Sequence, residues 1–152
     1  MQIITDTREQ TPYTFSRYPV EVIPGTLTAG DYSLPGFTDE VAIERKELSD
    51  LLGCLTHDRD RFTRELERLR GYSSAALLIE APLAIIQAGR YRSHMKPDAA
   101  VQSIFSIMQR YRMPVYFAKD RTDGEKFVYD FLRHFIRHAA ERYKAIASQG
   151  EA

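Results

Sequence analysis

The sequence predicts a single α/β domain built on a central mixed β-sheet flanked by helices. Short β-rich segments dominate the first 46 residues, and apolar residues then recur at helical spacing at Leu48, Leu51, Leu52 and Leu55. An uninterrupted apolar run at 75–79 follows, which is typical of a central strand buried on both faces. A chain of 152 residues has the size of one domain, so these strands are expected to share one sheet.

Four short strands are predicted in the first third of the chain. They span 2–6, 20–23, 30–34 and 41–46, and each is bounded by proline, glycine or a polar cluster. The dipeptide Pro35-Gly36 is typical of a turn, so the third and fourth strands are expected to form a hairpin. We therefore expect antiparallel hairpins in this part of the sheet and crossover helices later.

Helices and two further strands are predicted after residue 46. The first helix carries the leucine stripe, and Gly71 ends the second. No linker or repeat divides the chain, so one domain over 1–147 with a short tail at 148–152 is expected. The remaining predicted elements are a helix from about 58 to 70, a strand at 75–79, a short helix at 82–88, a helix from 97 to about 112, a strand at 115–118 and a long helix from about 123 into the low 140s.

Composition limits the compartment and the kinds of partner. Hydrophobic residues make up 43% of the chain, yet no apolar run approaches the length of a membrane span, so no membrane partner is expected. The single cysteine, Cys54, excludes an intrachain disulfide and fits a reducing compartment. Acidic residues appear by residue six, which is unlike a targeting peptide. We expect an intracellular protein, which would lie in the cytoplasm or nucleoid if its host is prokaryotic or viral.

Charge is unevenly distributed although the formal net charge is zero. Residues 1–44 carry two basic and seven acidic side chains, whereas 90–152 carry twelve basic and seven acidic ones. A metal-dependent enzyme acting on a phosphate backbone can show this pattern, because bound divalent cations reverse the local sign of an acidic region. A simple mixture of solvated charges is the alternative that composition leaves open.

The end of the fourth predicted strand combines charge with a buried pattern. Alternation places Glu44 and Lys46 on one face and Arg45 on the other, together with the apolar residues of that strand. An exposed ladder of charges at a strand end is one interpretation, since surface ion pairs contribute only about 0 to 1 kcal/mol. A reaction site on the Glu44 face is the other.

A second acid in the preceding strand favours the reaction site. The hairpin folds Asp31 back toward Glu44, and two carboxylates at short range need a cation between them. Mg²⁺ or Mn²⁺ suits such oxygen ligands, keeps several water molecules and contacts substrate phosphate. Lys46 beside that ion is expected to orient or help deprotonate an attacking water, or to stabilise charge on the phosphoryl oxygens.

Longer segments of the sequence resemble a known family. The text IITDTRE at 3–9, GDY at 30–32 and AIERKELSDL at 42–51 is similar to the nuclease domain of the XPF/Hef endonucleases. These enzymes carry a PD-(D/E)XK type of site with a GD, spacer, ERK-x-x-x-D signature, and Gly30 stands here in place of the proline. The likeness continues through FTRELERL, LLIE at 77–80 and the last helices, so it spans nearly the whole chain.

The resemblance implies a restriction-endonuclease-like fold and a metal-dependent DNA endonuclease of DNA repair or recombination. It implies cleavage at branched or single-strand/double-strand junction DNA, such as a flap or fork, with Mg²⁺ or Mn²⁺ held by Asp31 and Glu44. The catalytic residues that it implies are Asp31, Glu44, Arg45, Lys46, Asp6, Arg8, Glu9 and Asp50. For Asp50, an acid complementing the helix dipole in the first helical turn is a second interpretation, and the two are compatible.

Contacts with DNA and with a second protein chain are also expected. The resemblance implies a homodimer or heterodimer through the last helices, which would account for the broad apolar face of Phe127, Phe131 and Phe135; a thick core is the alternative. Members of the family usually carry helix-hairpin-helix modules that grip DNA, and none is expected in this chain. The candidate DNA-binding residues are Arg8, Arg45, Arg90, Arg92 and Lys96.

Two other functions remain open at this point. One is a non-catalytic DNA-binding or dimerisation module of the same fold, although such modules commonly lose their acids and Asp31, Glu44 and Lys46 are all present. The other is a relative of restriction enzymes or exonucleases with the same core. A panel of DNA substrates would separate them.

Overall fold

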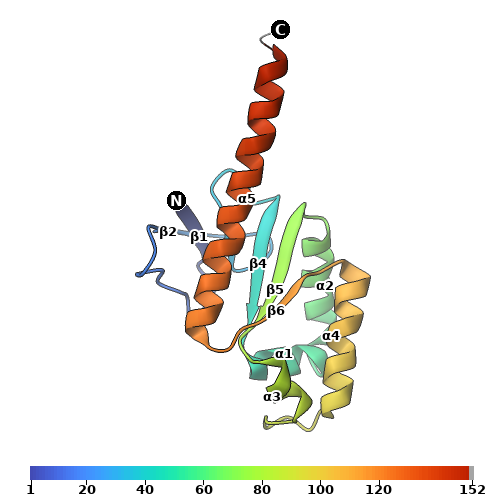
Figure 1. Cartoon of the computed structure of the whole chain (residues 1–152). Helices are drawn as coiled ribbons and strands as arrows, with labels where there is room; N and C mark the ends of the chain where they lie inside the picture. The colour runs from blue at the N-terminus through green and yellow to red at the C-terminus, as the bar shows by residue number, and fades with distance from the viewer. Residues whose placement is uncertain (151–152) are drawn as a thin grey trace.

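The computed structural model describes residues 1–150 and contains six strands and five helices (Figure 1). The helices at 48–55 and 59–70 directly follow the strand at 41–46, and the helix at 121–150 is the last element. The strands are β1 (Gln2–Asp6), β2 (Glu21–Gly25), β3 (Tyr32–Ser33), β4 (Val41–Lys46), β5 (Ser74–Ile79) and β6 (Val115–Phe117). The helices are α1 (Leu48–Leu55), α2 (Arg59–Arg70), α3 (Leu83–Gln87), α4 (Pro97–Tyr111) and α5 (Arg121–Gly150).

All six strands form one mixed sheet in the order β2-β1-β3-β4-β5-β6. β3 runs antiparallel to both β1 and β4, whereas β4, β5 and β6 are mutually parallel, as the helical crossovers between them require. The carboxyl ends of β4 and β5 therefore meet at one edge of the sheet, where Lys46 pairs with Ile79. The predicted α/β class with a central mixed sheet is confirmed.

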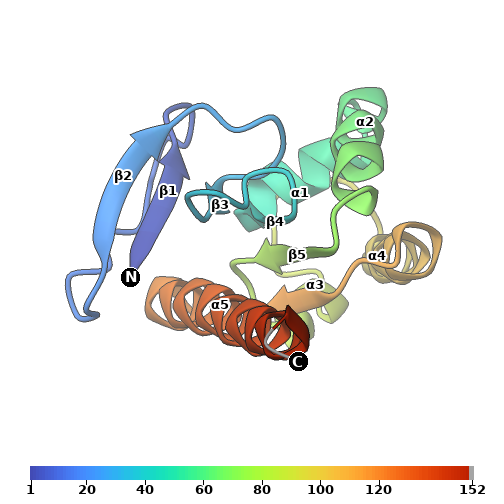
Figure 2. The same ribbon diagram turned by 90° about the horizontal axis from the view of Figure 1, so that it is seen from above.

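Helices cover the two faces of the sheet unequally (Figure 2). One face packs against α1, α2 and α4 through a core that includes Ala42, Leu77 and Ile79. The other face packs against α5, where Ile43, Leu78 and the helix residues Val128 and Leu132 share a second core. Successive residues of β4 thus enter different cores, and this alternation decides which charged side chains meet.

The structure corrects the predicted pairing of β1, the length of β3 and the length of the last helix. β1 and β2 are parallel rather than a hairpin, and Pro24 is tolerated because β2 is an edge strand. β3 covers only Tyr32–Ser33, since a left-handed Gly30 bends the chain before it.

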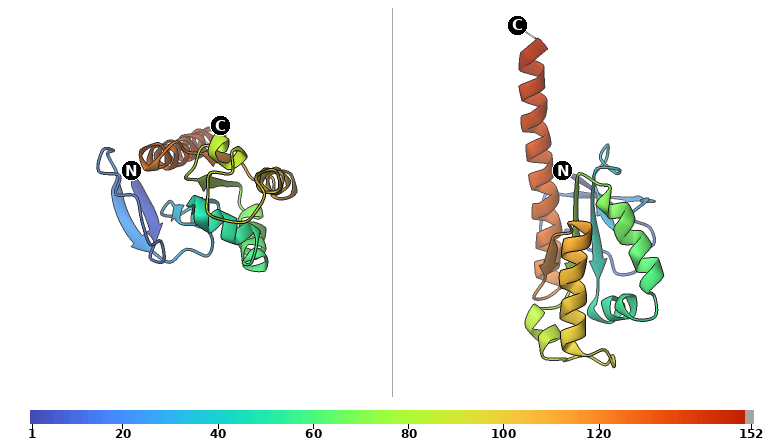
Figure 3. Two further views of the ribbon diagram at one scale, coloured as in Figure 1. Left: turned by 90° about the horizontal axis from the view of Figure 1, so that it is seen from below. Right: turned by 90° about the vertical axis from the view of Figure 1, so that its right-hand side faces the viewer.

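The last helix is also longer than predicted. α5 continues to Gly150, because its later residues are mostly good helix formers, and its second half extends beyond the rest of the chain (Figure 3). The predicted tail therefore begins inside this helix, and 151–152 lie outside the described residues. Within 1–150, no helix combines the length and apolar character that a membrane span needs.

Candidate active site

Asp31 and Glu44 are brought together by the register of β3 on β4. Tyr32 pairs with Ile43 in an antiparallel ladder, which brings Asp31 beside Glu44, and both side chains line the same cavity. Asp31 stays bonded to β4 outside this ladder, since Asp31 N donates to Ile43 O at 2.8 Å. In return, Arg45 N donates to Asp31 Oδ2 at 2.7 Å. Both carboxylates therefore have fixed positions.

Gly30 permits this close approach of the two strands. Its φ of +78° lies in the left-handed region that favours glycine. A Cβ atom at this position would lie 2.9 Å from Ala42 Cβ and 3.1 Å from Ile43 O, which are core and backbone atoms of β4. The glycine that precedes the aspartate is thus required by the geometry that sets Asp31 opposite Glu44.

Lys46 lies between two acids on the same face. Its Nζ is 3.0 Å from Glu44 Oε1 and 3.4 Å from Glu65 Oε2, the latter on α2. The side chains of Glu44 and Lys46 are only 9% and 12% exposed, so these charges meet largely out of water. The ammonium of Lys46 lies beside the carboxylates of Glu44 and Glu65, and Arg8, Arg61 and Arg68 line the adjoining cavity with Asp31.

The pKa values of these groups are shifted by burial and by the charges of their neighbours. Burial, and then the nearby charge of Glu44, raise the pKa of Asp31 from its ordinary 3.8 to about 8. Burial also raises the pKa of Glu44, against the opposing effect of Lys46. For Lys46, burial disfavours the charged form, but the charges of Glu44 and Glu65 outweigh it and raise its pKa. Lys46 is therefore protonated at neutral pH, and a nearby cation would favour the charged forms of Asp31 and Glu44 that burial disfavours.

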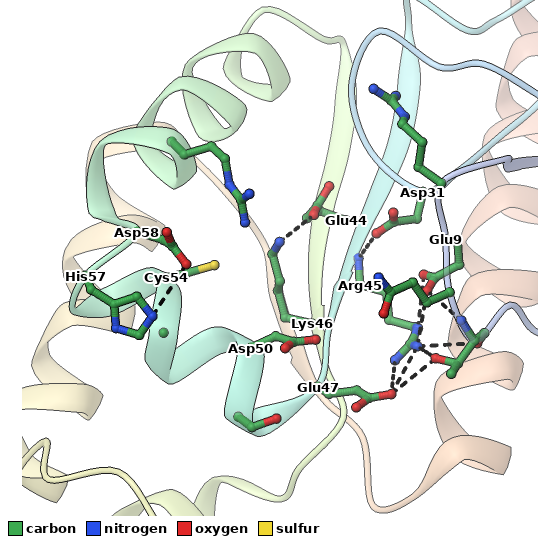
Figure 4. Close-up of a pocket in the computed structure, with 16 residues that line it drawn as sticks. Glu9, Asp31, Glu44, Arg45, Lys46, Glu47, Asp50, Cys54, His57 and Asp58 are labelled. Carbon is green, nitrogen blue, oxygen red and sulfur yellow. Dashed lines mark hydrogen bonds and ion pairs between the residues drawn. The ribbon is translucent and has the colours of Figure 1, made fainter.

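The two carboxylates suit a hard divalent cation. Their recorded contacts use Asp31 Oδ2 and Glu44 Oε1, and each carboxylate has a second oxygen. They open into a polar cavity of about 460 Å³ that lies between the sheet and α1 (Figure 4). Within residues 1–150, no group of three or more His, Cys, Asp or Glu side chains has metal-binding geometry. A cation held by Asp31 and Glu44 would complete its shell with water, as Mg²⁺ commonly does.

Arg45 belongs to a different cluster, on the α5 face of β4. Its guanidinium contacts Glu9 Oε2 at 3.2 Å and Glu80 Oε2 at 3.0 Å, and it also bonds Thr11 and Glu47. The Arg45 side chain is 3% exposed, and those of Glu9 and Glu80 are 8% exposed. Arg45 therefore braces the 9–11 segment and the end of β5 against β4. Its guanidinium contacts neither Asp31 nor Glu44 in the recorded hydrogen bonds and ion pairs of residues 1–150.

Asp6 and Arg8 lie beside the acid pair but contact each other. Arg8 Nε donates to Asp6 Oδ1 and its Nη2 to Asp6 Oδ2, at 2.8 and 2.9 Å. Leu27 N also donates to Asp6 Oδ2, at 2.7 Å. The bonds from Arg8, offset in part by burial, lower the pKa of Asp6 to about 2. Both residues line a second cavity with Asp31 and Glu44, so their bonds shape one wall of the site.

The other predicted residues lie at different distances from the acid pair. Asp50 is exposed in the first turn of α1 and lines the cavity of the acid pair. Arg90 and Arg92 line a neighbouring groove, and Lys96 caps the start of α4. The three phenylalanines of α5 are half-buried: Phe127 stacks on Tyr116 with ring centroids 4.3 Å apart, and Phe135 meets Phe37 at 5.3 Å. These contacts agree with the alternative of a thick core.

The acids that contact Lys46 and Arg45 were not predicted from the sequence. Glu65 lies three residues after Phe62 and four before Leu69, so it shares their inward helix face. A carboxylate on an apolar inward face was the available signal. Glu80 follows β5, which runs parallel to β4, so Glu80 lies near the carboxyl end of β4. No local pattern indicated Glu47 or Thr11.

The chain is similar in sequence to several known proteins. The ERCC4 domain model matches residues 5–131. The DNA repair protein RAD1 of Saccharomyces cerevisiae is 39% identical over 82 residues, which are 51% of this chain and 7% of RAD1. The DNA repair endonuclease XPF of Mus musculus is 34% identical over 100 residues, 61% of this chain and 10% of that protein. The chain thus spans a tenth or less of the length of these relatives.

Solved structures share the same fold. XPF from Aeropyrum pernix superposes with a TM-score of 0.71 and 23% identity over 88% of this chain and 60% of that chain. A structure described as XPF from Aeropyrum pernix in complex with DNA gives a TM-score of 0.70 and 21% identity over 90% and 65% of the two chains. The fold implied by the sequence resemblance is thereby confirmed.

Proposed function

The chain belongs to the ERCC4 domain family, and from this premise we propose that it is a divalent-metal-dependent DNA endonuclease. Its substrates in this proposal are branched or single-strand/double-strand junction DNA, such as flaps and forks. The observation that carries the proposal is the placement of Asp31 opposite Glu44, with pKa values that burial raises. The names of RAD1 and XPF, a DNA repair protein and a DNA repair endonuclease, agree with it.

The roles of the chain's own groups follow from their positions. Asp31 and Glu44 would hold Mg²⁺ or Mn²⁺, which when bound supplies a Lewis acid that polarises a phosphoryl oxygen and acidifies water. Lys46 is held by Glu44 and stays protonated, so it orients the attacking water and stabilises negative charge on the phosphate instead of removing a proton. Water attacks phosphorus in line and loses its proton to solvent, while the bond to the leaving oxygen breaks and that oxygen takes a proton from solvent. Arg45, Asp6, Arg8 and Glu9 position this site.

The retained acids favour an enzyme over a non-catalytic module. A module that only binds DNA gains nothing from burying Asp31 and Glu44 together, because like charges at short range destabilise the fold. The choice between a junction-selective enzyme and a restriction or exonuclease relative depends on the substrate. The intracellular location expected from the sequence is consistent with a DNA substrate.

A substrate panel tests the proposed function. Flap, fork, four-way junction and plain duplex DNA of one sequence are incubated with the protein in Mg²⁺, Mn²⁺ or chelator. We expect cleavage of flap or fork DNA in either metal, and none in chelator or by the variant Lys46→Ala. Cleavage of every duplex at similar rates would favour the restriction-type alternative. Binding without cleavage in either metal would favour the non-catalytic module.

We also propose pairing with a second chain, identical or different, through α5. The half-exposed Phe127, Phe131 and Phe135 begin an apolar stripe that continues along the helix, where Tyr143 and Ile146 are 73% and 65% exposed. Sedimentation of the purified chain is expected to give a dimer, or a monomer that pairs with a different chain. The double variant Tyr143→Glu, Ile146→Glu leaves both cores untouched and is expected to prevent pairing.

A further inference from the structure

A second, larger groove adjoins the cavity of the acid pair. It has a volume of about 700 Å³, within the usual range for ligand sites of about 300–1,000 Å³, and lies between α1 and the 90–95 loop. Leu48 and Leu52 form one wall, and Tyr91 and Met95 form the other. These four side chains also pack on the core below, so the walls and floor of the groove are apolar and fixed in place.

The rim of the groove is basic, in contrast to the acid cavity. Arg90, Arg92, His57 and His94 line it, and its lining includes no aspartate or glutamate among the described residues. An apolar floor with an aromatic ring and a rim of arginines is the combination that holds single-stranded nucleic acid, since bases stack on the ring and phosphates meet the cations. A duplex cannot use such a floor, because its bases are already stacked on one another.

The groove is continuous with the proposed reaction site. Ser49, Gly53 and His57 of the α1 region line both the groove and the cavity that holds Asp31 and Glu44. Gly53 has no side chain at this border, and the ring of His57 lies next to it, since a Cβ atom on Gly53 would be 3.5 Å from His57 Cε1 and Nε2. A DNA strand whose phosphate reaches the acid pair can therefore place its next nucleotides in the groove by passing His57.

We propose that this groove holds unpaired nucleobases of the DNA strand that flanks the cut, with Tyr91 as the stacking surface. The inference rests on the proposed function and deepens it, because it makes unstacked bases beside the cut the feature that the domain selects. Arg90 and Arg92 contact the phosphates of the same nucleotides. The domain thereby distinguishes a single-stranded arm from a duplex by its bases as well as by its backbone.

Abasic DNA separates base contacts from backbone contacts. The test uses the full chain carrying Glu44→Gln, which prevents cleavage, and a fork whose unpaired arm has either normal or abasic nucleotides next to the junction. Fluorescence anisotropy at fixed salt is expected to show roughly 5-fold to 100-fold weaker binding of the abasic fork. Adding Tyr91→Leu should weaken binding of the normal fork to a similar extent and leave the abasic fork nearly unaffected, whereas Tyr91→Phe should retain the difference.

Matched arginine variants provide the control. Arg92→Ala is expected to weaken both forks equally and to reduce the salt dependence of binding. Arg70→Ala should change neither, because Arg70 lies beside Ser74 and Pro114 at the opposite end of the parallel strands. If Tyr91→Leu fails to fold, 2-aminopurine in the arm still reports stacking, since its fluorescence should be quenched when the Tyr91-containing protein binds.

Equal affinity for normal and abasic forks would overturn the inference, as would equal losses on both forks in Tyr91→Leu. Failure of the proposed function is distinguishable, because it is measured by cleavage of the normal fork with wild-type protein in Mg²⁺. Base-dependent binding without that cleavage would support the proposed role of the groove and contradict the proposed nuclease function. Cleavage without base-dependent binding would support the nuclease function and contradict the role of the groove.

Discussion

Two charged clusters lie back to back on the end of β4, and they differ in how their charges are neutralised. On the α5 face, the guanidinium of Arg45 contacts the carboxylates of Glu9 and Glu80 at 3.2 and 3.0 Å. On the opposite face, Asp31 and Glu44 lie near each other, and Lys46 is shared between Glu44 and Glu65. Glu9, Glu47 and Glu80 of the first cluster all have ion-pair partners, whereas Asp31 of the second has none among the ion pairs of residues 1–150.

The pKa values report the same difference. Burial opposes ionisation of Arg45, but the charges of Glu9 and Glu80 more than compensate and raise its pKa, so Arg45 is charged at every ordinary pH. The pKa of Asp31 is raised instead, to about 8, because burial and Glu44 disfavour its charge. Removing one partner from a satisfied buried cluster destabilises the fold, whereas strongly perturbed pKa values mark an unsatisfied cluster as a candidate functional site.

The largest expected effect separates activity from stability on the acid side. Glu44→Gln removes the negative charge beside Asp31 and one of the two carboxylates that would hold a cation. Cleavage of fork DNA should therefore fall at least about 100-fold. Because burial already disfavours the charge of Glu44, the melting temperature in chelator should be unchanged or higher. Gel-based cleavage assays and thermal melts measure the two. Wild-type-like cleavage would remove Glu44 from the site.

The reverse result is expected on the arginine side. Arg45→Met leaves the carboxylates of Glu9 and Glu80, each 8% exposed, buried without their cation, and should cost about 3–5 kcal/mol of unfolding free energy in urea titrations. Arg45→Lys keeps the charge and should cost less. A variant Arg45→Met that is as stable as wild type but inactive would show that Arg45 acts in catalysis, as the family resemblance implied.

A smaller effect is expected from the glycine that sets Asp31 in place. Gly30→Ala forces a side chain into a left-handed backbone 2.9 Å from Ala42 Cβ, and should cost about 1–3 kcal/mol in the same titrations. Cleavage should also fall, because Asp31 moves with the strand. Gly36→Ala is the matched control: its φ is +82°, but no atom lies within 4 Å of the added Cβ. Equal activity of the two variants would separate Gly30 from the site.

The smallest effect is a pH dependence of stability without metal. Below about pH 4 the Asp31 carboxyl is protonated in both the folded and the unfolded chain, so it does not alter stability. As pH rises, the unfolded chain ionises first, and the free energy of unfolding should fall until the folded pKa of about 8 is passed. Melting in chelator should therefore be lower at pH 8 than at pH 6. If Asp31→Asn shows an equal difference in melting temperature between pH 6 and pH 8, other groups cause that difference.

Much of the fold and the core of the site could be predicted from the sequence. The alternation of β4 placed Glu44 and Lys46 on one face and Arg45 on the other, and the turn at Pro35-Gly36 made β3 and β4 neighbours. These features are local, and local patterns of period two and 3.6 are what a single sequence records. The parallel pairing of β1 with β2 left no such record, because their connection contains no helix.

The partners of the charged residues were harder to predict. Arg45 meets Glu9 across 36 residues, and Lys46 meets Glu65 across two helices, so the contacts depend on tertiary packing. The family resemblance made Arg45 a candidate catalyst, although its guanidinium bonds Glu9 and Glu80 and not the acid pair. The length of α5 was underestimated because its end buries little apolar surface, and periodicity detects burial.

Direct titration with Mn²⁺, followed by the electron paramagnetic resonance of the free ion, tests most simply whether the unneutralised acid pair is the metal site. The account predicts saturable Mn²⁺ binding by wild-type protein at pH 8, weaker binding at pH 6, and loss of that binding in Glu44→Gln but not in folded Arg45→Lys. Undiminished Mn²⁺ binding by Glu44→Gln, with Asp31 and the fold intact, would contradict it.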